Sequence, residues 1–372
     1  AMAPARASFL TRPTIPTGPE SEPGRVFGPP AILPWPMGKV VELETQGTAR
    51  GRRARRRVSK TALVLGGGGF TGGVYEIGAL RALDLLAVNH TVNEFDVYVG
   101  TSAGSFIASL TANGVTPEEM MRVLNRELRS PIPDIDLQML LRPNYRGFLR
   151  GSVTLPFKLL GVVRELIENL GESSAVDLAT GLASVLPPGL YTSSGIERYV
   201  REVLSDPDRT NDFRHLSSEL YLTATDLDTT ERVILGEGEW ADIPISHAVA
   251  ASGALPLIYE PVEIRGREFI DGGILSTTNI DVAVERGARF VVVINPLVPY
   301  VNDFSKRIPT MTSSRAHRVS DMGMVGIGNQ AFRMISHDRL HRAVEIWEER
   351  YPGVDIILIE PELDDALMFG TS

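Results

Sequence analysis

A serine inside a small-residue motif is the first residue of this chain with a clear chemical use. Residues 100–104 read Gly-Thr-Ser-Ala-Gly and fit the pattern G-x-S-x-G. The motif lies between residues 95–99, which predict a strand, and residues 102–112, which predict a helix, as a nucleophilic serine requires. Only small flanking residues, here Gly100 and Gly104, let strand and helix approach closely at so sharp a turn. We therefore expect the Ser102 hydroxyl at the carboxyl edge of a sheet, where it can attack an acyl carbonyl.

A glycine-rich turn precedes this motif. Residues 61–65 are a short apolar run typical of a buried strand, and residues 66–73 then hold six glycines. Glycines let backbone N–H groups approach a ligand. If this turn lies beside the serine, the N–H groups of its glycines would form an oxyanion hole for a tetrahedral intermediate.

The same turn also matches a dinucleotide fingerprint, G-x-G-x-x-G, from Gly67 to Gly72. That fingerprint needs an acidic residue about 20 positions later, at the end of the next strand. Asp84 lies inside the predicted helix 73–86, and the next predicted strand leads into Gly100. The nucleotide interpretation is therefore the weaker alternative.

An aspartate followed by two glycines is the third element. Asp271 ends the predicted hairpin 262–270, and Gly272 and Gly273 come directly after it. A carboxylate at such a place can face a pocket. Taken alone, the position fits equally a strand-end aspartate that caps the next turn.

The elements that must position these residues alternate along the chain. Further strands are predicted at 220–235, as a pair, and at 289–295 and 355–359; a capping box at Thr116–Glu119 begins another helix. Strands that alternate with helices indicate an α/β fold with a mostly parallel sheet covered on both faces.

Together these blocks resemble the patatin-like phospholipase family over roughly residues 61–300. The resemblance rests on the glycine turn at 66–73, on residues 75–80 after it, on Gly100–Gly104, on Ala251–Pro256 and on Asp271–Gly273. The family implies a three-layer α/β/α fold and hydrolysis of lipid acyl esters by a Ser–Asp dyad without histidine. It maps the nucleophile to Ser102, the base to Asp271 and the oxyanion hole to Gly67–Gly69.

One position departs from the family's pattern. The glycine loop of the family usually carries an arginine or lysine shortly before its last glycine, and Thr71 or Gly72 stands there in this chain. Backbone N–H groups would then hold the oxyanion without a cation. This departure keeps open a non-catalytic lipid-binding scaffold on the same fold.

Histidine would be required by the second alternative, a Ser–Asp–His esterase on an α/β-hydrolase sheet, in which the histidine follows the acid along the chain. His317, His337 and His341 follow Asp271, but we interpret them as surface residues of a helical, polar region. His247 precedes Asp271 and is expected to be structural. No metal-ligand spacing was found, and Asp226, Asp228 and Asp242 are too scattered for calcium, so we expect no metal and no cofactor.

Composition narrows the class and the location further. The chain has 372 residues, 43% of them hydrophobic and none of them cysteine, which excludes disulfides and thiolate catalysis. No apolar run approaches the roughly 18–20 residues of a membrane span, and the N-terminus has no secretory pattern. We expect a cytoplasmic protein with peripheral membrane contact, and a lipid or phospholipid acyl ester as substrate.

The N-terminal arm, residues 1–60, differs from the body in charge and composition. It carries 11 Lys and Arg against 4 Asp and Glu, whereas the remainder carries 26 against 42. Nine prolines predict an irregular segment. Its basic run, Arg50–Lys60, is expected either to be solvated or to contact anionic lipid, and the arm is a candidate for homo-oligomer contacts. The acidic body argues against nucleic acid as a partner.

Within the predicted catalytic domain, 61–300, residues 131–190 form a proline-rich insertion. Its amphipathic stretch Leu155–Leu170 fits either a helix packed on the core or a lid beside a lipid site. Residues 301–372 are expected to add a helical segment and a final strand to the same domain.

Overall fold

The computed structural model describes residues 59–125, 132–134, 141–145, 188–305, 308, 316–365 and 368. Residues 1–58 of the N-terminal arm and the Leu155–Leu170 stretch lie outside these ranges, so the expectations for them stay predictions; Lys60, the last residue of the arm, begins the first strand of the fold. No helix of the described part is long and apolar enough to cross a membrane.

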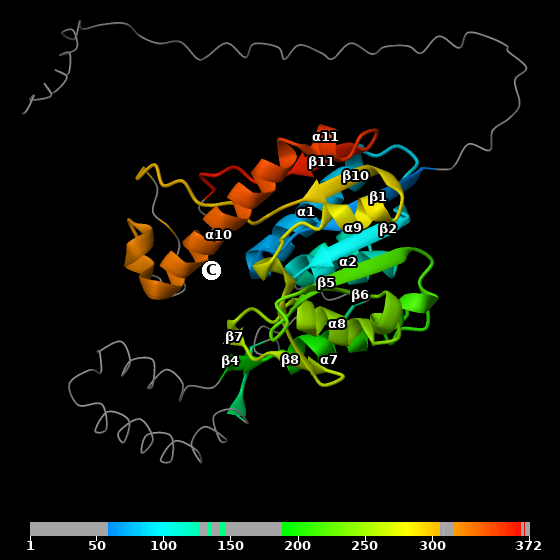
Figure 1. The fold of residues 1–372 in the computed structure, drawn as a ribbon, viewed down its shortest axis with the longest axis horizontal. Helices are drawn as coiled ribbons and strands as arrows, with labels where there is room; N and C mark the ends of the chain where they lie inside the picture. The colour runs from blue at the N-terminus through cyan, green and yellow to red at the C-terminus, as the bar shows by residue number, and fades with distance from the viewer. Residues whose placement is uncertain are drawn as a thin grey trace, which may run out of the picture. The chain divides into compact units, whose positions relative to one another are not determined.

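An eight-stranded sheet forms the centre of the fold (Figure 1). Its strands run in the order β11-β10-β1-β2-β5-β9-β8, and β6 pairs with β5. The pairs from β11 to β5 are parallel, and β6, β8 and β9 add antiparallel pairs at one side. The strands are β1 (Lys60–Leu65), β2 (Val97–Thr101), β5 (Glu219–Asp226), β6 (Arg232–Leu235), β8 (Val262–Ile264), β9 (Arg267–Asp271), β10 (Ala288–Ile294) and β11 (Asp355–Ile359).

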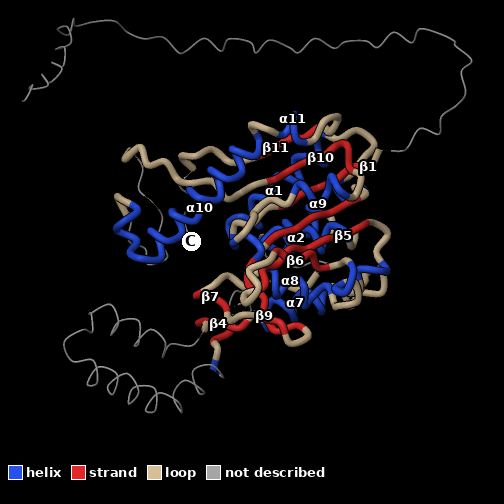
Figure 2. The backbone as a smooth tube through the Cα atoms, in the orientation of Figure 1, coloured by secondary structure: helices blue, strands red, loops and turns tan. Residues whose placement is uncertain are grey.

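Helices cover both faces of the sheet (Figure 2). One face packs against α1 (Gly69–Leu86), α2 (Ala103–Ala112), α3 (Pro117–Leu124), α7 (Ser194–Val203) and α8 (Ile245–Ser252). The other face packs against α9 (Ile280–Glu285), α10 (Gly323–Val344) and α11 (Trp347–Arg350). The fold is therefore the expected three-layer α/β/α arrangement with a mostly parallel sheet.

The alternation of side chains along β1 explains why two layers of helices are needed. Leu63 and Leu65 belong to the core on one face of the sheet, and Ala62 and Val64 to the core on the other, all fully buried. A strand with apolar residues on both sides must be covered twice, which is typical of parallel sheets.

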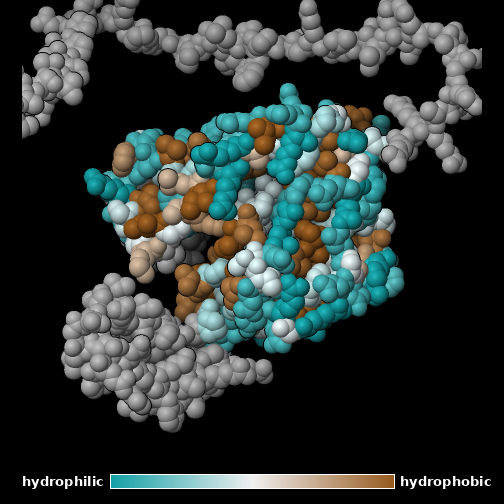
Figure 3. Space-filling model, in the orientation of Figure 1, coloured by the Kyte–Doolittle hydropathy of each residue, from teal (hydrophilic) through white to brown (hydrophobic). Residues whose placement is uncertain are grey.

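A smaller three-stranded sheet, β3-β4-β7, lies beside this domain core. Its strands are β3 (Arg142–Pro143), β4 (Gly189–Thr192) and β7 (Leu257–Tyr259). Exposed apolar side chains of β4 and β7, Leu190 and Leu257, contribute to the hydrophobic surface seen there. In the view of Figure 3 a hollow opens between this surface and that of α10.

Two elements have boundaries that differ from the sequence prediction by more than one residue. The strand expected at 95–99 is β2, Val97–Thr101, because residues Val92–Glu94 form a short 3₁₀ turn. Thr91 and Glu94 cap that turn reciprocally, and Asp96 accepts a hydrogen bond from the Thr61 N–H instead of joining the strand. The helix expected from Gly73 begins earlier, at Gly69.

Candidate active site

Ser102 occupies the turn between β2 and α2 with a left-handed backbone. Its φ of 55° and ψ of −123° are costly for a residue with a side chain, by roughly 1–3 kcal/mol. The Ser102 N–H donates to Ser252 Oγ at 2.9 Å, and Gly104 N–H donates to Gly66 O at 3.1 Å. These contacts hold the strained turn in place.

The two glycines of the motif are required by close backbone approach. A Cβ at Gly100 would lie 2.6 Å from Ser105 Cα, and one at Gly104 would lie 2.4 Å from the carbonyl oxygens of Leu65 and Gly66. Neither contact is sterically possible without a backbone shift. The motif therefore fits because strand, turn and helix touch at these points.

Asp271 reaches the same place from an antiparallel strand. Thr101 pairs with Thr223 of β5, and the next residue of β5, Ala224, pairs with Asp271 of β9. β9 thus ends level with the serine turn. A Cβ at Gly272 would lie 2.3 Å from Thr223 O, so only glycine lets the chain turn away directly after the aspartate.

The Ser102 and Asp271 side chains are in direct contact. Ser102 Oγ donates to Asp271 Oδ2 at 2.5 Å, and the Gly273 N–H donates to Asp271 Oδ1 at 2.7 Å. Asp271 is 2% exposed. Burial raises the pKa of the Asp271 carboxyl to about 6, and the hydrogen bonds from Ser102 and Gly273 oppose this rise. The carboxylate is ionised at neutral pH and basic enough to accept a proton.

The glycine loop lies against the serine, as expected. A Cβ at Gly67 would sit 3.2 Å from Ser102 Cβ, so the loop backbone and the serine are in contact. Gly68 caps α1, and Gly69 begins it with a φ of 61°. Among the described residues, no acceptor is found for the N–H groups of Gly67, Gly68 or Gly69. Free donors at a helix N-terminus favour negative charge beside Ser102.

Thr71 is one of the two residues, with Gly72, that can stand where the resemblance leads one to expect a cation. Its hydroxyl donates to Met368 O at 3.3 Å, and the same carbonyl accepts a bond from Arg333 Nη2 at 2.9 Å. Arg333 is 3% exposed, and burial lowers its pKa to about 10, which leaves it protonated at neutral pH. The Arg333 guanidinium of α10 and the Thr71 hydroxyl therefore share one acceptor, the Met368 carbonyl oxygen.

A polar network behind the serine was not identified from the sequence. Thr101 Oγ1 and Thr223 Oγ1 lie 2.8 Å apart, and Asn279 Nδ2 donates to both hydroxyls. Arg232 donates to Asn279 Oδ1 at 2.8 Å and holds the amide in this orientation. Ser252 was noticed only as part of the Ala251–Pro256 block. No local sequence signal links these residues, which meet only through the sheet.

Glu76 is a second buried carboxyl that the sequence analysis did not weigh. It lies on α1, is 0% exposed, and neither carboxyl oxygen has a hydrogen-bond partner among the described residues. Burial raises its pKa well above the ordinary value, and the nearby Gly66 N–H, which donates to Ile294 O, opposes the rise. Burial therefore favours the protonated form of Glu76, which lies close to the start of the glycine loop.

The histidines lie elsewhere. Across the described residues, which include all six histidines, no hydrogen bond joins an imidazole to Ser102 or Asp271. His247 is on α8 and faces Glu197, and His337 and His341 are on α10. His317 stands in a bend before α10, not in a helix as expected. Asp84, considered for a nucleotide, binds Thr91 and the Val92 N–H at the far end of α1.

A cavity of about 200 Å³ lies near this region but does not include the reactive pair. Gly273, Thr277, Arg339 and Trp347 are among the residues that line it, whereas Ser102, Asp271 and Gly67 do not. The geometry at Ser102, rather than this cavity, defines the candidate site.

Comparison with known proteins agrees with the fold and motifs. Residues 63–284 match the family described as patatin-like phospholipase, which is more than half of the chain. The chain belongs to this family. A probable lipid hydrolase, 463L, of Invertebrate iridescent virus 6 is 24% identical over 229 residues, which cover 60% of this chain and 63% of that protein.

Two solved structures are similar more distantly. VipD from Legionella pneumophila is 20% identical, with a TM-score of 0.32, over 63% of this chain and 50% of VipD. ExoU, solved in complex with SpcU from Pseudomonas aeruginosa, is 16% identical, with a TM-score of 0.29, over 79% of this chain and 53% of that chain.

Proposed function

We propose that this protein hydrolyses acyl esters of lipids, with Ser102 as nucleophile and Asp271 as base. The observation that carries the proposal is the 2.5 Å hydrogen bond from Ser102 Oγ to Asp271 Oδ2, made in a buried site beside the glycine loop. Membership of the patatin-like phospholipase family supports a hydrolase acting on lipid. No cofactor enters the reaction.

The first half of the reaction forms an acyl-enzyme. Asp271 accepts the Ser102 hydroxyl proton as Oγ attacks the ester carbonyl carbon, and the carbonyl oxygen becomes an oxyanion held by the Gly67–Gly69 N–H groups. The C–O bond to the alcohol then breaks, and the leaving oxygen takes the proton from Asp271.

The second half releases the fatty acid. Asp271 accepts a proton from water, and the resulting hydroxide equivalent attacks the acyl-enzyme carbonyl. Collapse of the second tetrahedral intermediate frees the carboxylic acid, and Ser102 Oγ regains the proton. One carboxylate can serve both halves because it starts and ends each half ionised.

Replacement of the pair gives the direct test. We expect Ser102→Ala to abolish p-nitrophenyl ester turnover and Asp271→Asn to reduce it about 10²–10⁴-fold, the range for a lost general base. Ser109→Ala removes another hydroxyl of α2, one that bonds Phe106 O, and serves as the matched control. Thermal melts establish that each variant is folded. Turnover by Asp271→Asn at the wild-type rate would refute the dyad.

Covalent labelling distinguishes an enzyme from a non-catalytic lipid-binding scaffold, the alternative raised by the missing cation in the glycine loop. A fluorophosphonate should modify one serine per chain, and peptide mass spectrometry should place the label on Ser102. Absence of labelling in a folded, monodisperse sample would favour a lipid-binding scaffold.

A further inference from the structure

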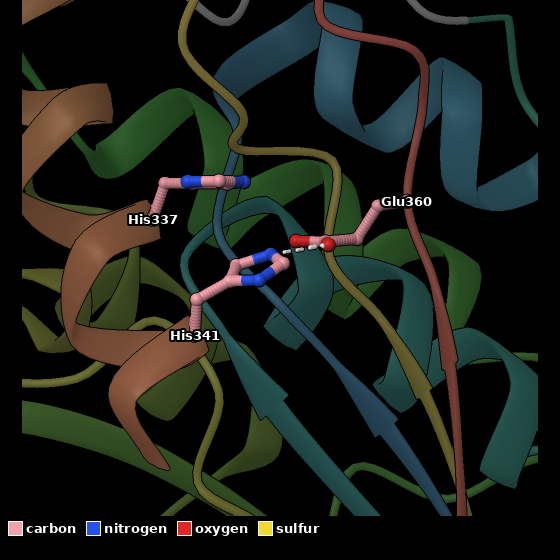
Figure 4. A group of neighbouring side chains, drawn as sticks. All are labelled: His337, His341 and Glu360. Carbon is pink, nitrogen blue, oxygen red and sulfur yellow. Dashed lines mark hydrogen bonds and ion pairs between the residues drawn. The ribbon is translucent and has the colours of Figure 1, made fainter. Parts of the chain in front are cut away.

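Two histidines and a glutamate converge at a second place, at the end of β11. His337 and His341 are four residues apart on α10, and Glu360 follows β11 directly. Figure 4 shows both imidazoles pointing from α10 toward the Glu360 carboxylate. One ligand atom from each residue lies within 4.8 Å of the other two.

We propose that His337, His341 and Glu360 form a binding site for one divalent transition-metal ion of the zinc class, which ties α10 to the end of β11. Residues four apart on a helix project from one face, so both rings reach the same point. Two imidazoles and one carboxylate are a ligand set that zinc accepts, with water in the fourth position. Calcium and magnesium prefer oxygen ligands, so this set disfavours them.

The distances need only side-chain adjustment. Around a tetrahedral ion with bonds of about 2.0–2.1 Å, ligand atoms stand roughly 3.3 Å apart. His341 Nε2 and Glu360 Oε2 are 2.8 Å apart and must separate slightly, whereas the His337 ring must move toward them. The two rings already lie with centroids 4.0 Å apart.

The surroundings of Glu360 hold its carboxylate so that Oε1 is bonded to the core and Oε2 is directed at His341. Asn295 Nδ2 donates to Glu360 Oε1 at 2.7 Å, and Asn295 is 1% exposed, so this partner is held by the core. Oε2 is the oxygen that faces His341. Outer partners of this kind orient metal ligands in known sites.

Charge and access also suit a cation. The Glu360 carboxylate brings a negative charge to the point where the two imidazoles meet. Burial, and then the neighbouring His341, lower the pKa of His337, which keeps its imidazole neutral and able to ligate. The His341 side chain is 44% exposed, which gives an ion a route in.

A bound ion would restrain the elements around the cluster. Asn295 follows β10, and its side-chain oxygen lies 3.2 Å from where a Gly66 Cβ would be. A metal at Glu360 would therefore fix α10, β11 and, through Asn295, the start of the glycine loop. We assign the ion no part in ester cleavage, because no hydrogen bond joins its three ligands to Ser102 or Asp271 in the described structure.

Zinc binding by the full chain, prepared without a histidine tag, tests the proposal. Calorimetric titration with ZnCl₂ should give one equivalent per chain, MgCl₂ should give none, and zinc should raise the melting temperature in an EDTA-reversible way. With no cysteine and six histidines in the chain, few other ligands compete. His337→Gln should weaken zinc binding by at least about tenfold, the smaller effect seen when an outer partner is disturbed. His317→Gln, which removes an exposed histidine outside the cluster, should bind as the wild type does.

A second measurement needs no variant. Zinc should protect His337 and His341 from diethyl pyrocarbonate, and should leave His317 reactive, as read by peptide mass spectrometry of the wild type. Any one of three results would overturn the site. These are equal zinc affinity in wild type and His337→Gln, absence of stoichiometric zinc binding, and failure of zinc to protect His337 and His341. The His341–Glu360 contact would then be an ion pair that anchors α10.

Discussion

Ser102–Asp271 and His337–His341–Glu360 stand near the same edge of one sheet, but the fold makes them in different ways. The first pair is built into backbone turns that tolerate only glycine at Gly100, Gly104 and Gly272. The second group consists of half-buried side chains brought together by a helix and a strand end, with no comparable backbone constraint. The residues that shape the Ser102–Asp271 site belong to short contiguous motifs. The His337–His341–Glu360 cluster depends instead on how elements distant in the sequence pack.

Gly67→Ala is the most direct test of whether the Ser102 site depends on close backbone contact with the glycine loop. A methyl group there would meet Ser102 Cβ at 3.2 Å, so Gly67→Ala should displace the loop or the serine by a few tenths of an ångström. Misplacement near the reacting atoms lowers rates steeply, and we expect a loss of about 10–100-fold in kcat with little change in melting temperature. Gly78→Ala, where a Cβ on α1 meets nothing within 4 Å, is the matched control. Equal turnover by the two variants would remove the glycine loop from the site.

The pH dependence tests whether Asp271 is the base. With a pKa of about 6, Asp271 is increasingly protonated below that pH and cannot accept the Ser102 proton. The kcat/KM for a neutral, soluble ester should therefore fall about tenfold per pH unit below about pH 6. Initial rates across the acid range provide the measurement. An acid limb that persists unchanged in the residual activity of Asp271→Asn would point to a different titrating group.

The same pKa has a consequence for stability. The folded-state pKa lies above the ordinary 3.8, so the stability associated with protonated Asp271 is present below about pH 3.8 and is lost as pH rises to about 6. Ionised Asp271 thus costs the fold free energy at neutral pH, as expected where a site is kept for function.

Glu76→Gln tests a second buried carboxyl, one whose protonated form is favoured by burial. The Glu76 pKa is raised well above its usual value by burial, so native stability should fall as pH rises above the ordinary 4.5 toward the folded-state pKa. Glutamine cannot ionise, and Glu76→Gln should reduce this decline. Urea melts of both proteins at a series of pH values above about 4.5 measure the change, because the contribution of Asp271 is common to both. Glu349→Gln, an exposed change on α11, should keep the wild-type decline.

Features that rest on short sequence motifs could be predicted from the sequence, whereas features that rest on packing between distant elements could not. The strand-turn-helix units around Gly66–Gly73 and Gly100–Gly104 could be predicted because hydrophobic period and glycine position are local signals. The hairpin that ends at Asp271 was also predicted, but its alignment with Ser102 depends on the β5–β9 register.

Residues outside motifs were missed for a physical reason. The side chains of Ser252, Asn279 and Glu76 carry no distinctive spacing, and their roles arise from burial against strands distant in sequence. The four-residue spacing of His337 and His341 was a usable signal, but a metal site needs a third ligand, and only the pairing of β11 with β10 brings Glu360 there. The expectation of no metal stays a prediction, which zinc titration tests.

The smallest expected effect concerns the histidines, and it separates the two sites functionally. If Asp271 is the only protein base, His317→Ala, His337→Ala and His341→Ala should each leave the catalytic rate within about a few-fold of wild type, whereas loss of a triad histidine costs about 10³-fold or more. Turnover of a soluble ester in EDTA is the appropriate measurement, because it removes any contribution of bound zinc to the stability of α10. A large loss confined to one histidine would support the Ser–Asp–His alternative, although no hydrogen bond joins an imidazole to Ser102 or Asp271 in the described structure. Small losses in His337→Ala and His341→Ala alone, accompanied by lower melting temperatures, would instead reflect the packing of α10 against β11, which is the role we assign to that cluster.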